Sequence, residues 1–222
     1  MCHKNVQDGD MQRKPVLSAV LLFCIVAGCL CCELIITKDP QYLDLNHCQV
    51  PPNQEFLFGT DTLGRDLFSM IWYGGRISLL IGAGAAGIST GIAVLFGAVS
   101  GCAPAWADVL LMRFAEILLS VPSLLVIIFI QAVLGEATVW SISFAIGITS
   151  WMSMAKMIRT EVRQICSSEY VLASKCMGGS FFHILWKHLA PNFMPSVRFY
   201  AVMNIRSAIA VEAALSFMGL GL

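Results

Sequence analysis

Charged side chains are scarce in this sequence. Only 13% of the 222 residues are Asp, Glu, Lys or Arg, whereas 57% are apolar, and the mean hydropathy is +0.75. Soluble domains usually carry about 25% charged residues. The formal net charge is zero, so no overall positive field points to nucleic acid as a partner. This composition indicates a membrane protein.

Motifs for nucleotide chemistry are also missing. No Gly-Lys pair occurs, which excludes a phosphate-binding P-loop. Residues 82–87 formally match the GxGxxG fingerprint, but the match lies inside an apolar run, without the preceding strand and the later acidic residue that dinucleotide binding needs. We expect no catalytic residue, no metal ligand and no cofactor on this chain, and no enzymatic activity of its own.

The nine cysteines do not form the framework of a small secreted protein, because long apolar runs exclude that class. Most of them are interpreted as small buried hydrophobic residues. Cys29, Cys31 and Cys32 lie close together at the end of the first apolar run. A soft-metal site at these three thiols is the alternative interpretation.

The apolar residues are gathered in runs long enough to cross a bilayer, which takes about 20 residues. The sequence therefore predicts an all-α, polytopic transmembrane helix bundle. A polar tail (1–15) precedes the first span (16–36) and a loop rich in acidic residues (37–77). The core (78–222) holds four further spans, at about 78–101, 109–134, 138–154 and 196–222, which makes five in total.

Individual residues predict further features of these spans. Two GxxxG pairs, Gly87 with Gly91 and Gly97 with Gly101, predict close approach between helix backbones in the second span. Pro122 is expected to kink the third span. Arg113 and Glu116 are three residues apart, so they share one helix face.

Residues 155–195 form the amphipathic, basic segment of the chain. Ser168 is expected to cap a helix with Glu169 in its first turn, and Gly178 to end that helix. Ser180 then caps a second helix, which Pro191 stops. Two short helices joined at a glycine form a compact unit suited to a groove on a partner.

Basic residues indicate the orientation of the chain. Five Lys or Arg lie in residues 155–195 and three in the tail, whereas the loop at 37–77 holds more acidic than basic residues. The positive-inside rule places the tail and the segment 155–195 in the cytoplasm and the acidic loop outside. We therefore expect a multi-pass protein with its N-terminus inside.

The segment 168–192 resembles the EAA loop of ABC-importer membrane subunits, in the version found in peptide and nickel permeases. Glu169, Ala173 and Gly178 stand at the matching positions, and Ser174 replaces the second alanine of the motif. Two further matches are FGTDTLGRDLFS at 58–69 and EAALSFMGLGL at 212–222. Members of this family carry a sixth helix after the last motif, so the resemblance implies that a sixth helix is missing from this sequence.

The resemblance implies a dipeptide/oligopeptide permease C-like subunit of a type I, binding-protein-dependent importer in the bacterial inner membrane. Such a subunit forms half of the translocation path. The implied partners are a second homologous permease subunit, two ABC ATPase subunits that hold ATP and Mg²⁺, an extracytoplasmic substrate-binding protein and membrane lipid. The ATPase-coupling residues would be Glu169, Ala173, Gly178, Ser180, Phe181, Phe182, Ile184 and Leu185. As alternatives, Glu169 only stabilises a helix start, and the apolar residues pack on the chain itself.

Charged residues within spans are costly in hydrocarbon, and they indicate function by default. Arg206 and Glu212 lie in the last span, where members of this family line the translocation path. A spacing of six puts them on different helix faces, so we expect no direct pair between them. Asp61, Arg65 and Asp66 in the extracytoplasmic loop either contact the binding protein or tie the loop down, and we favour the structural role.

Two other classes of function remain open. A secondary transporter or channel would need its own carboxylates in mid-membrane, for which only Glu116 and Glu212 qualify. The other class is a degenerate, non-transporting membrane scaffold. The substrate cannot be read from the sequence, because permeases of this kind carry peptides, nickel or metal chelates.

Overall fold

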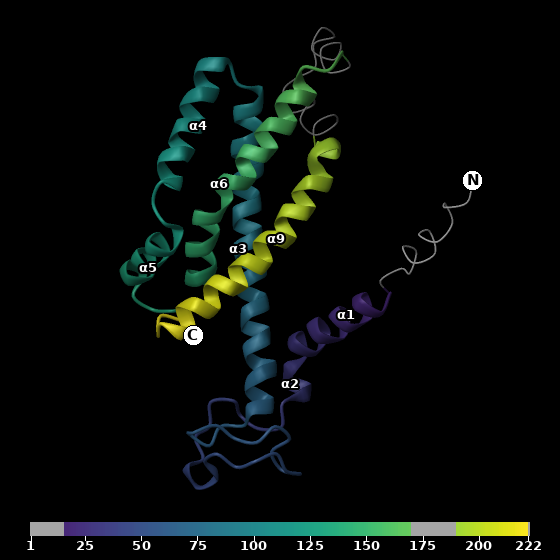
Figure 1. The fold of residues 1–222 in the computed structure, drawn as a ribbon, viewed down its shortest axis with the longest axis vertical. Coiled ribbons are helices and arrows are strands. Elements are labelled where there is room, and N and C mark those ends of the chain that lie inside the picture. Colours follow the sequence, from purple (N-terminus) through teal and green to yellow (C-terminus); the bar gives the residue numbers. More distant parts are fainter. Residues whose placement is uncertain (1–15, 170–189, 222) are drawn as a thin grey trace, which may run out of the picture. The chain divides into compact units, whose positions relative to one another are not determined.

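The computed structural model describes residues 16–169 and 190–221, which divide into two compact units. One unit covers residues 1–77 and the other residues 78–222. Both are helical (Figure 1). Within the described residues no β-strand forms, and the pairing of Thr60 with Asp66 is an isolated antiparallel bridge.

The first unit contains α1 (Val16–Leu30), α2 (Cys32–Ile35), the 3₁₀ helix η1 (Leu45–His47) and the beginning of α3 (Leu67–Cys102). The predicted first span is thus divided, because the helix breaks at Cys31 and only four residues follow in α2. The ring of Trp72 on α3 lies against Gly28 on α1, where a Cβ would collide with it. The Arg76 guanidinium pairs with Glu33 at 2.7 Å.

The acidic loop between α2 and α3 is held by its own contacts. Phe56 is buried at its centre, and the Lys38 ammonium lies 3.7 Å from the centroid of that ring. The Thr60 hydroxyl accepts a hydrogen bond from the Val50 amide and donates one to the His47 carbonyl. This network fixes the loop without regular secondary structure.

The second unit contains most of α3, then α4 (Ala105–Leu119), α5 (Ser123–Leu134), α6 (Val139–Cys166) and α9 (Ala190–Phe217). Pro122 stands directly before α5, and the axes of α4 and α5 differ by 79°. The kink predicted at Pro122 is therefore a break between two helices. Thr138 and Ser141 form a capping box that begins α6.

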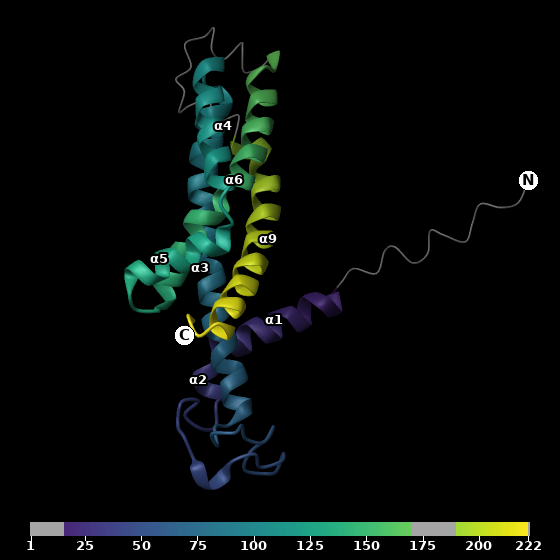
Figure 2. The same cartoon turned by 60° about the vertical axis from the view of Figure 1, so that its left-hand side comes forward.

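Helix α6 is the centre of the second unit, and it packs against α5 and α9 (Figure 2). Trp151 on α6 is buried, with its ring centroid 4.7 Å from that of Phe96 on α3. The core draws on α3, α4, α6 and α9, and its buried members are Ala93, Ala98, Ala115, Trp151, Met152, Met154, Ala155, Ile158, Val162, Phe193 and Val197.

One of the two predicted glycine pairs lies at a close helix contact. A Cβ on Gly97 would lie 2.7 Å from the Ala155 carbonyl oxygen, and a Cβ on Gly101 would lie 2.7 Å from Val162. The pair at Gly87 and Gly91 does not meet a neighbouring helix, since a Cβ there would touch nothing among the described residues within 4 Å. The close approach predicted at that pair stays a prediction, since no helix of the described residues meets it.

Helix α3 is the one described helix that is long and apolar enough to cross a membrane alone. The bent pair α4 and α5 passes the same test when the two are taken together, and α1 is a shorter apolar helix. Helices α6 and α9 are each 28 residues long but carry charged residues within them. The number of spans predicted from the sequence, five, is not confirmed by these helices.

Candidate functional site

A buried carboxylate joins three helices at one end of the second unit. Asp108, in the first turn of α4, is 1% exposed. Its Oδ1 accepts hydrogen bonds from the Ser100 hydroxyl of α3 at 2.7 Å and from Nε of Arg159 at 2.5 Å. Its Oδ2 accepts from Nη1 of Arg163 at 2.5 Å and from Nη2 of Arg159. We call Asp108, Ser100, Arg159 and Arg163 the Asp108 cluster.

The local sequence explains why these groups meet. Arg159 and Arg163 are four residues apart on α6, so both guanidinium groups project from one face. Asp108 lies one turn after Pro104, which begins α4, where a negative charge also complements the helix dipole. A buried carboxylate is tolerated only when charged donors satisfy it, and the fork of Arg159 does so with two parallel bonds. The cluster therefore fixes the end of α6 to α3 and α4.

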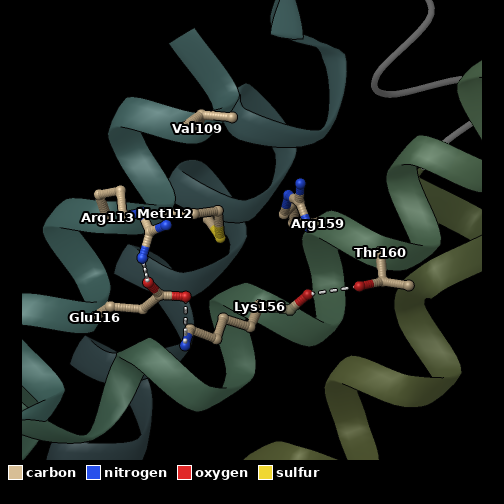
Figure 3. Close-up of a pocket in the computed structure, with 7 residues that line it drawn as sticks. All are labelled: Val109, Met112, Arg113, Glu116, Lys156, Arg159 and Thr160. Carbon is tan, nitrogen blue, oxygen red and sulfur yellow. Dashed lines mark hydrogen bonds and ion pairs between the residues drawn. The ribbon is translucent and has the colours of Figure 1, made fainter. Parts of the chain in front are cut away.

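A second, more exposed set of charges lies one to two turns along the same two helices (Figure 3). Glu116 on α4 pairs with Arg113 at 3.1 Å, as the spacing predicts. Its other oxygen lies 3.7 Å from the Lys156 ammonium on α6. With Arg159 these side chains line a cavity between α4 and α6.

The last turns of α6 also contact α9. The Ser196 hydroxyl donates to the Glu161 carboxylate at 2.6 Å, while the other oxygen of Glu161 is buried and has no partner among the described residues. Beyond α6, the Ser168 hydroxyl donates back to the Ile165 carbonyl. Glu169 follows with an exposed side chain.

Of the predicted ATPase-coupling residues, the structure describes one. Glu169 lies in the described part of the chain, directly after the fixed end of α6. The other seven lie outside the described residues: Ala173, Gly178, Ser180, Phe181, Phe182, Ile184 and Leu185. The roles assigned to them stay predictions.

The two charges in α9 have different surroundings. Arg206 is exposed, and within the described ranges no carboxylate pairs with it. Glu212 is 7% exposed, and its two oxygens accept hydrogen bonds from Ser78 on α3 at 2.9 Å and from Ser216 at 2.8 Å. Both recorded partners of Glu212 are thus serine hydroxyls. A further polar contact joins Asn204 to Ser89 at 3.1 Å.

The charged residues Asp61, Arg65 and Asp66 of the loop between α2 and α3 form bonds within the first unit. Asp61 accepts hydrogen bonds from the amides of Leu63 and Arg65 and from the Arg65 guanidinium, all at 2.8 Å. Burial acts to raise the pKa of Asp61, but the bonds from Arg65 and Leu63 outweigh it and hold the pKa below its ordinary value. Asp66 is buried and accepts from Ser69 and Thr37. This geometry fits the structural role for these residues.

Cys29 and Cys32 are buried and Cys31 is exposed. Across residues 16–169 and 190–221, no three His, Cys, Asp or Glu side chains are placed to hold a metal ion together.

The Asp108 cluster was not predicted from the sequence. Asp108 falls between two predicted spans, and the basic residues after the fourth span indicated only the orientation of the chain. The spacing of Arg159 and Arg163 was a usable signal, because two arginines four apart at a helix end call for a shared acidic partner. Since 51 residues separate Asp108 from Arg159, the spacing alone could not identify that partner.

Comparisons with known proteins agree on one family. Residues 93–222 match the model of the family described as binding-protein-dependent transport system inner membrane component. The chain is 36% identical over 206 residues to the oligopeptide transport system permease protein OppC of Bacillus subtilis, covering 93% of this chain and 67% of that protein.

Two further relatives match most of the chain. The dipeptide transport system permease protein DppC of Bacillus subtilis is 41% identical over 178 residues, which cover 80% of this chain and 55% of the relative. The probable D,D-dipeptide transport system permease protein DdpC of Escherichia coli is 34% identical over 206 residues, which cover 93% of this chain and 69% of the relative. The chain thus spans between just over half and about two thirds of the length of these relatives.

Proposed function

Because the chain belongs to the family of binding-protein-dependent transport system inner membrane components, we propose that it is the permease subunit of an ATP-driven peptide importer. It forms half of a translocation path, and a second, similar permease subunit forms the other half. Peptides are the proposed substrate class because the relatives carry oligopeptide, dipeptide and D,D-dipeptide permease names. Those names give no support to nickel or metal chelates as substrates.

The proposed location is the bacterial inner membrane, with five spans and the N-terminus inside. The excess of basic residues in 155–195 supports a cytoplasmic position for that segment. The loop at 37–77 then lies outside, where it meets an extracytoplasmic substrate-binding protein. This chain binds no nucleotide, and two separate ATPase subunits hold ATP and Mg²⁺.

The observation that carries the mechanism is the Asp108 cluster. It fixes the end of α6 to α3 and α4, directly before the segment that resembles an EAA loop. When an ATPase subunit moves that segment, α6 must carry α4 with it, since charged bonds join the two helices. ATP binding and hydrolysis can then shift the bundle between inward-open and outward-open states.

Arg206 is the proposed path-lining charge of α9, because it is exposed and has no carboxylate partner in the described part of the chain. Glu212 has a different proposed role from the one expected of it. Its bond to Ser78 joins α9 to α3, and its bond to Ser216 within α9 holds the carboxylate in place, so Glu212 supports the wall of the path.

The proposal is tested in proteoliposomes that contain the full chain, its partner permease, the ATPase subunits and the binding protein. Arg163→Gln removes one bond of the Asp108 cluster from a side chain that is 55% exposed, so folding is retained. Arg198→Gln, on the exposed side of α9, is the matched loss of one charge. We expect peptide-stimulated ATP hydrolysis and uptake to fall severalfold in Arg163→Gln and to stay unchanged in Arg198→Gln. Equal coupling in both variants would refute this transmission route.

A further inference from the structure

A cavity of about 470 Å³ lies between α4 and α6, beside the Asp108 cluster (Figure 3). This volume falls within the roughly 300–1,000 Å³ of typical small-molecule sites. Its polar lining comes from both helices, with Arg113 and Glu116 on α4 and Lys156, Arg159 and Thr160 on α6. Met112 adds an apolar wall. The role proposed above for the Asp108 cluster does not use this cavity.

The charges around the cavity do not balance. Arg159 and Arg163 share the single carboxylate of Asp108, and Arg113 and Lys156 share that of Glu116. Among the described residues, each carboxylate therefore leaves one positive charge uncompensated. The Arg113 side chain is 75% exposed and uses one nitrogen on Glu116, while Lys156 is 3.7 Å from its partner. Both side chains keep donors available for an anion.

An apolar stripe runs along the same helix. Leu110, Phe114 and Ile117 follow the i, i+4, i+7 spacing of one helix face, and each is more than half exposed. A ligand that uses the whole surface needs an anionic group for the cavity and apolar chains for the stripe. Free phosphate has only the first of these, and an acidic phospholipid has both.

The depth of the cavity fits a lipid headgroup. Residues 109–116 begin four residues from the start of α4, so they lie about 6–16 Å along its axis. The cavity side chains of α6 lie six to ten residues before its end. In the proposed topology the beginning of α4 and the end of α6 face the cytoplasm. Basic pockets between membrane helices on that side bind acidic lipid headgroups.

We propose that the cavity between α4 and α6 binds the phosphate headgroup of an acidic phospholipid, whose acyl chains cover the stripe formed by Leu110, Phe114 and Ile117. Arg113 and Lys156 hold the phosphate, and Arg159 stays bonded to Asp108. A bound lipid would join α4 to α6 a second time, one to two turns from the Asp108 cluster. Acidic lipid would therefore support the same contact that the proposed transport cycle uses.

The test uses the purified, delipidated full chain in a neutral detergent, with bound lipid counted by native mass spectrometry. Phosphatidylglycerol should be retained in preference to phosphatidylcholine. Arg113→Gln and Lys156→Gln should each weaken phosphatidylglycerol binding about fivefold, the effect expected for one basic residue near an anionic surface. Arg198→Gln, a matched charge loss on α9, should leave binding unchanged.

A variant that binds the lipid more strongly than the wild type distinguishes an effect on the site from a loss of folding. Glu116→Gln removes the carboxylate that competes for Arg113 and Lys156, so it should strengthen phosphatidylglycerol binding by a similar factor, which an unfolded protein cannot do. Equal binding of the two lipids, or an equal loss in Arg198→Gln, would overturn the proposal. Competition by inorganic phosphate at the same concentration as phosphatidylglycerol would also overturn it, because the site would then take a free anion.

This site rests on the proposed membrane topology, but its assay involves no transport. A chain that prefers phosphatidylglycerol yet assembles with no ATPase would refute the proposed function and leave the lipid site standing. A chain that transports peptide with no lipid preference would refute the lipid site alone.

Discussion

Asp108 is the residue on which most of the described architecture depends, because one buried carboxylate holds three helices. Removing one partner from a buried ion pair leaves an uncompensated charge, which costs about 3–5 kcal/mol. Glu116 gives a matched comparison, since it also pairs with two cations but its side chain is 47% exposed, against 2% for Asp108. Burial is thus the main difference between the two carboxylates.

The Asp108→Asn variant should therefore lower the free energy of unfolding by about 3–5 kcal/mol, and Glu116→Gln by about 0–1 kcal/mol. Thermal unfolding of the purified chain in neutral detergent checks both values. A similar small change in the two variants would mean that Asp108 is solvated in the membrane and does not fix the helices.

The loop between α2 and α3 should loosen in acid because of Asp61. Its pKa is lowered in the folded loop, so the ionised form contributes stability at all pH values above its ordinary pKa, about 3.9. That contribution is lost as the pH falls through the lowered folded pKa. Hydrogen exchange at residues 61–67, corrected for the intrinsic rate, should show this loss below about pH 4.

The Asp61→Asn variant isolates the contribution of this carboxyl from those of Asp44 and Glu55, whose pKa values are also lowered. It should exchange faster than the wild type at neutral pH and should lack part of the acid transition. An unchanged acid transition in the variant would assign the loosening to those other two carboxyls.

At the scale of helices, α3 presents Gly97 to the backbone of α6 at a close contact. Gly97→Ala places a Cβ 2.7 Å from a backbone oxygen of α6, which cannot move without shifting the helix. Overpacking of this kind costs about 1–3 kcal/mol. Gly87→Ala meets open space, so it should stabilise the helix by about 0.5–1 kcal/mol through its better backbone propensity.

The expected changes in stability have opposite signs in these two variants, so each serves as the control for the other. Unfolding temperatures of Gly97→Ala and Gly87→Ala, measured side by side, should move down and up respectively. A decrease of similar size in both would show that Gly87 also lies against a helix in the assembled protein.

The sequence predicted some features of the elements and missed others. Composition and motifs predicted the helical class and the family, and the i, i+3 spacing predicted the pair of Arg113 with Glu116. The division of the first span at Cys31 was not predicted, because the apolar run continues on both sides of Cys31 and Glu33 alone interrupts it. Long-range pairings such as Asp108 with Arg159 depend on how helices pack, which local patterns do not encode.

At the scale of the whole molecule, the proposed transport cycle depends on one transfer of motion, from an ATPase subunit through the segment after α6 into the bundle. Glu169 is the predicted docking residue nearest to the described helices, and its side chain is exposed. If it meets a basic group on the ATPase, a like charge at this position will weaken docking. If it only stabilises a helix start, its reversal will cost about 0.3–1 kcal/mol and will leave docking intact.

The most direct measurement is ATPase co-purification with peptide-stimulated ATP hydrolysis for Glu169→Lys, at matched membrane abundance. Glu136→Lys, a charge reversal in the turn between α5 and α6, is the control. We predict that Glu169→Lys loses most bound ATPase and its peptide stimulation, while Glu136→Lys retains both. Wild-type binding and stimulation in Glu169→Lys would contradict the claim that the end of α6 leads directly into the ATPase contact.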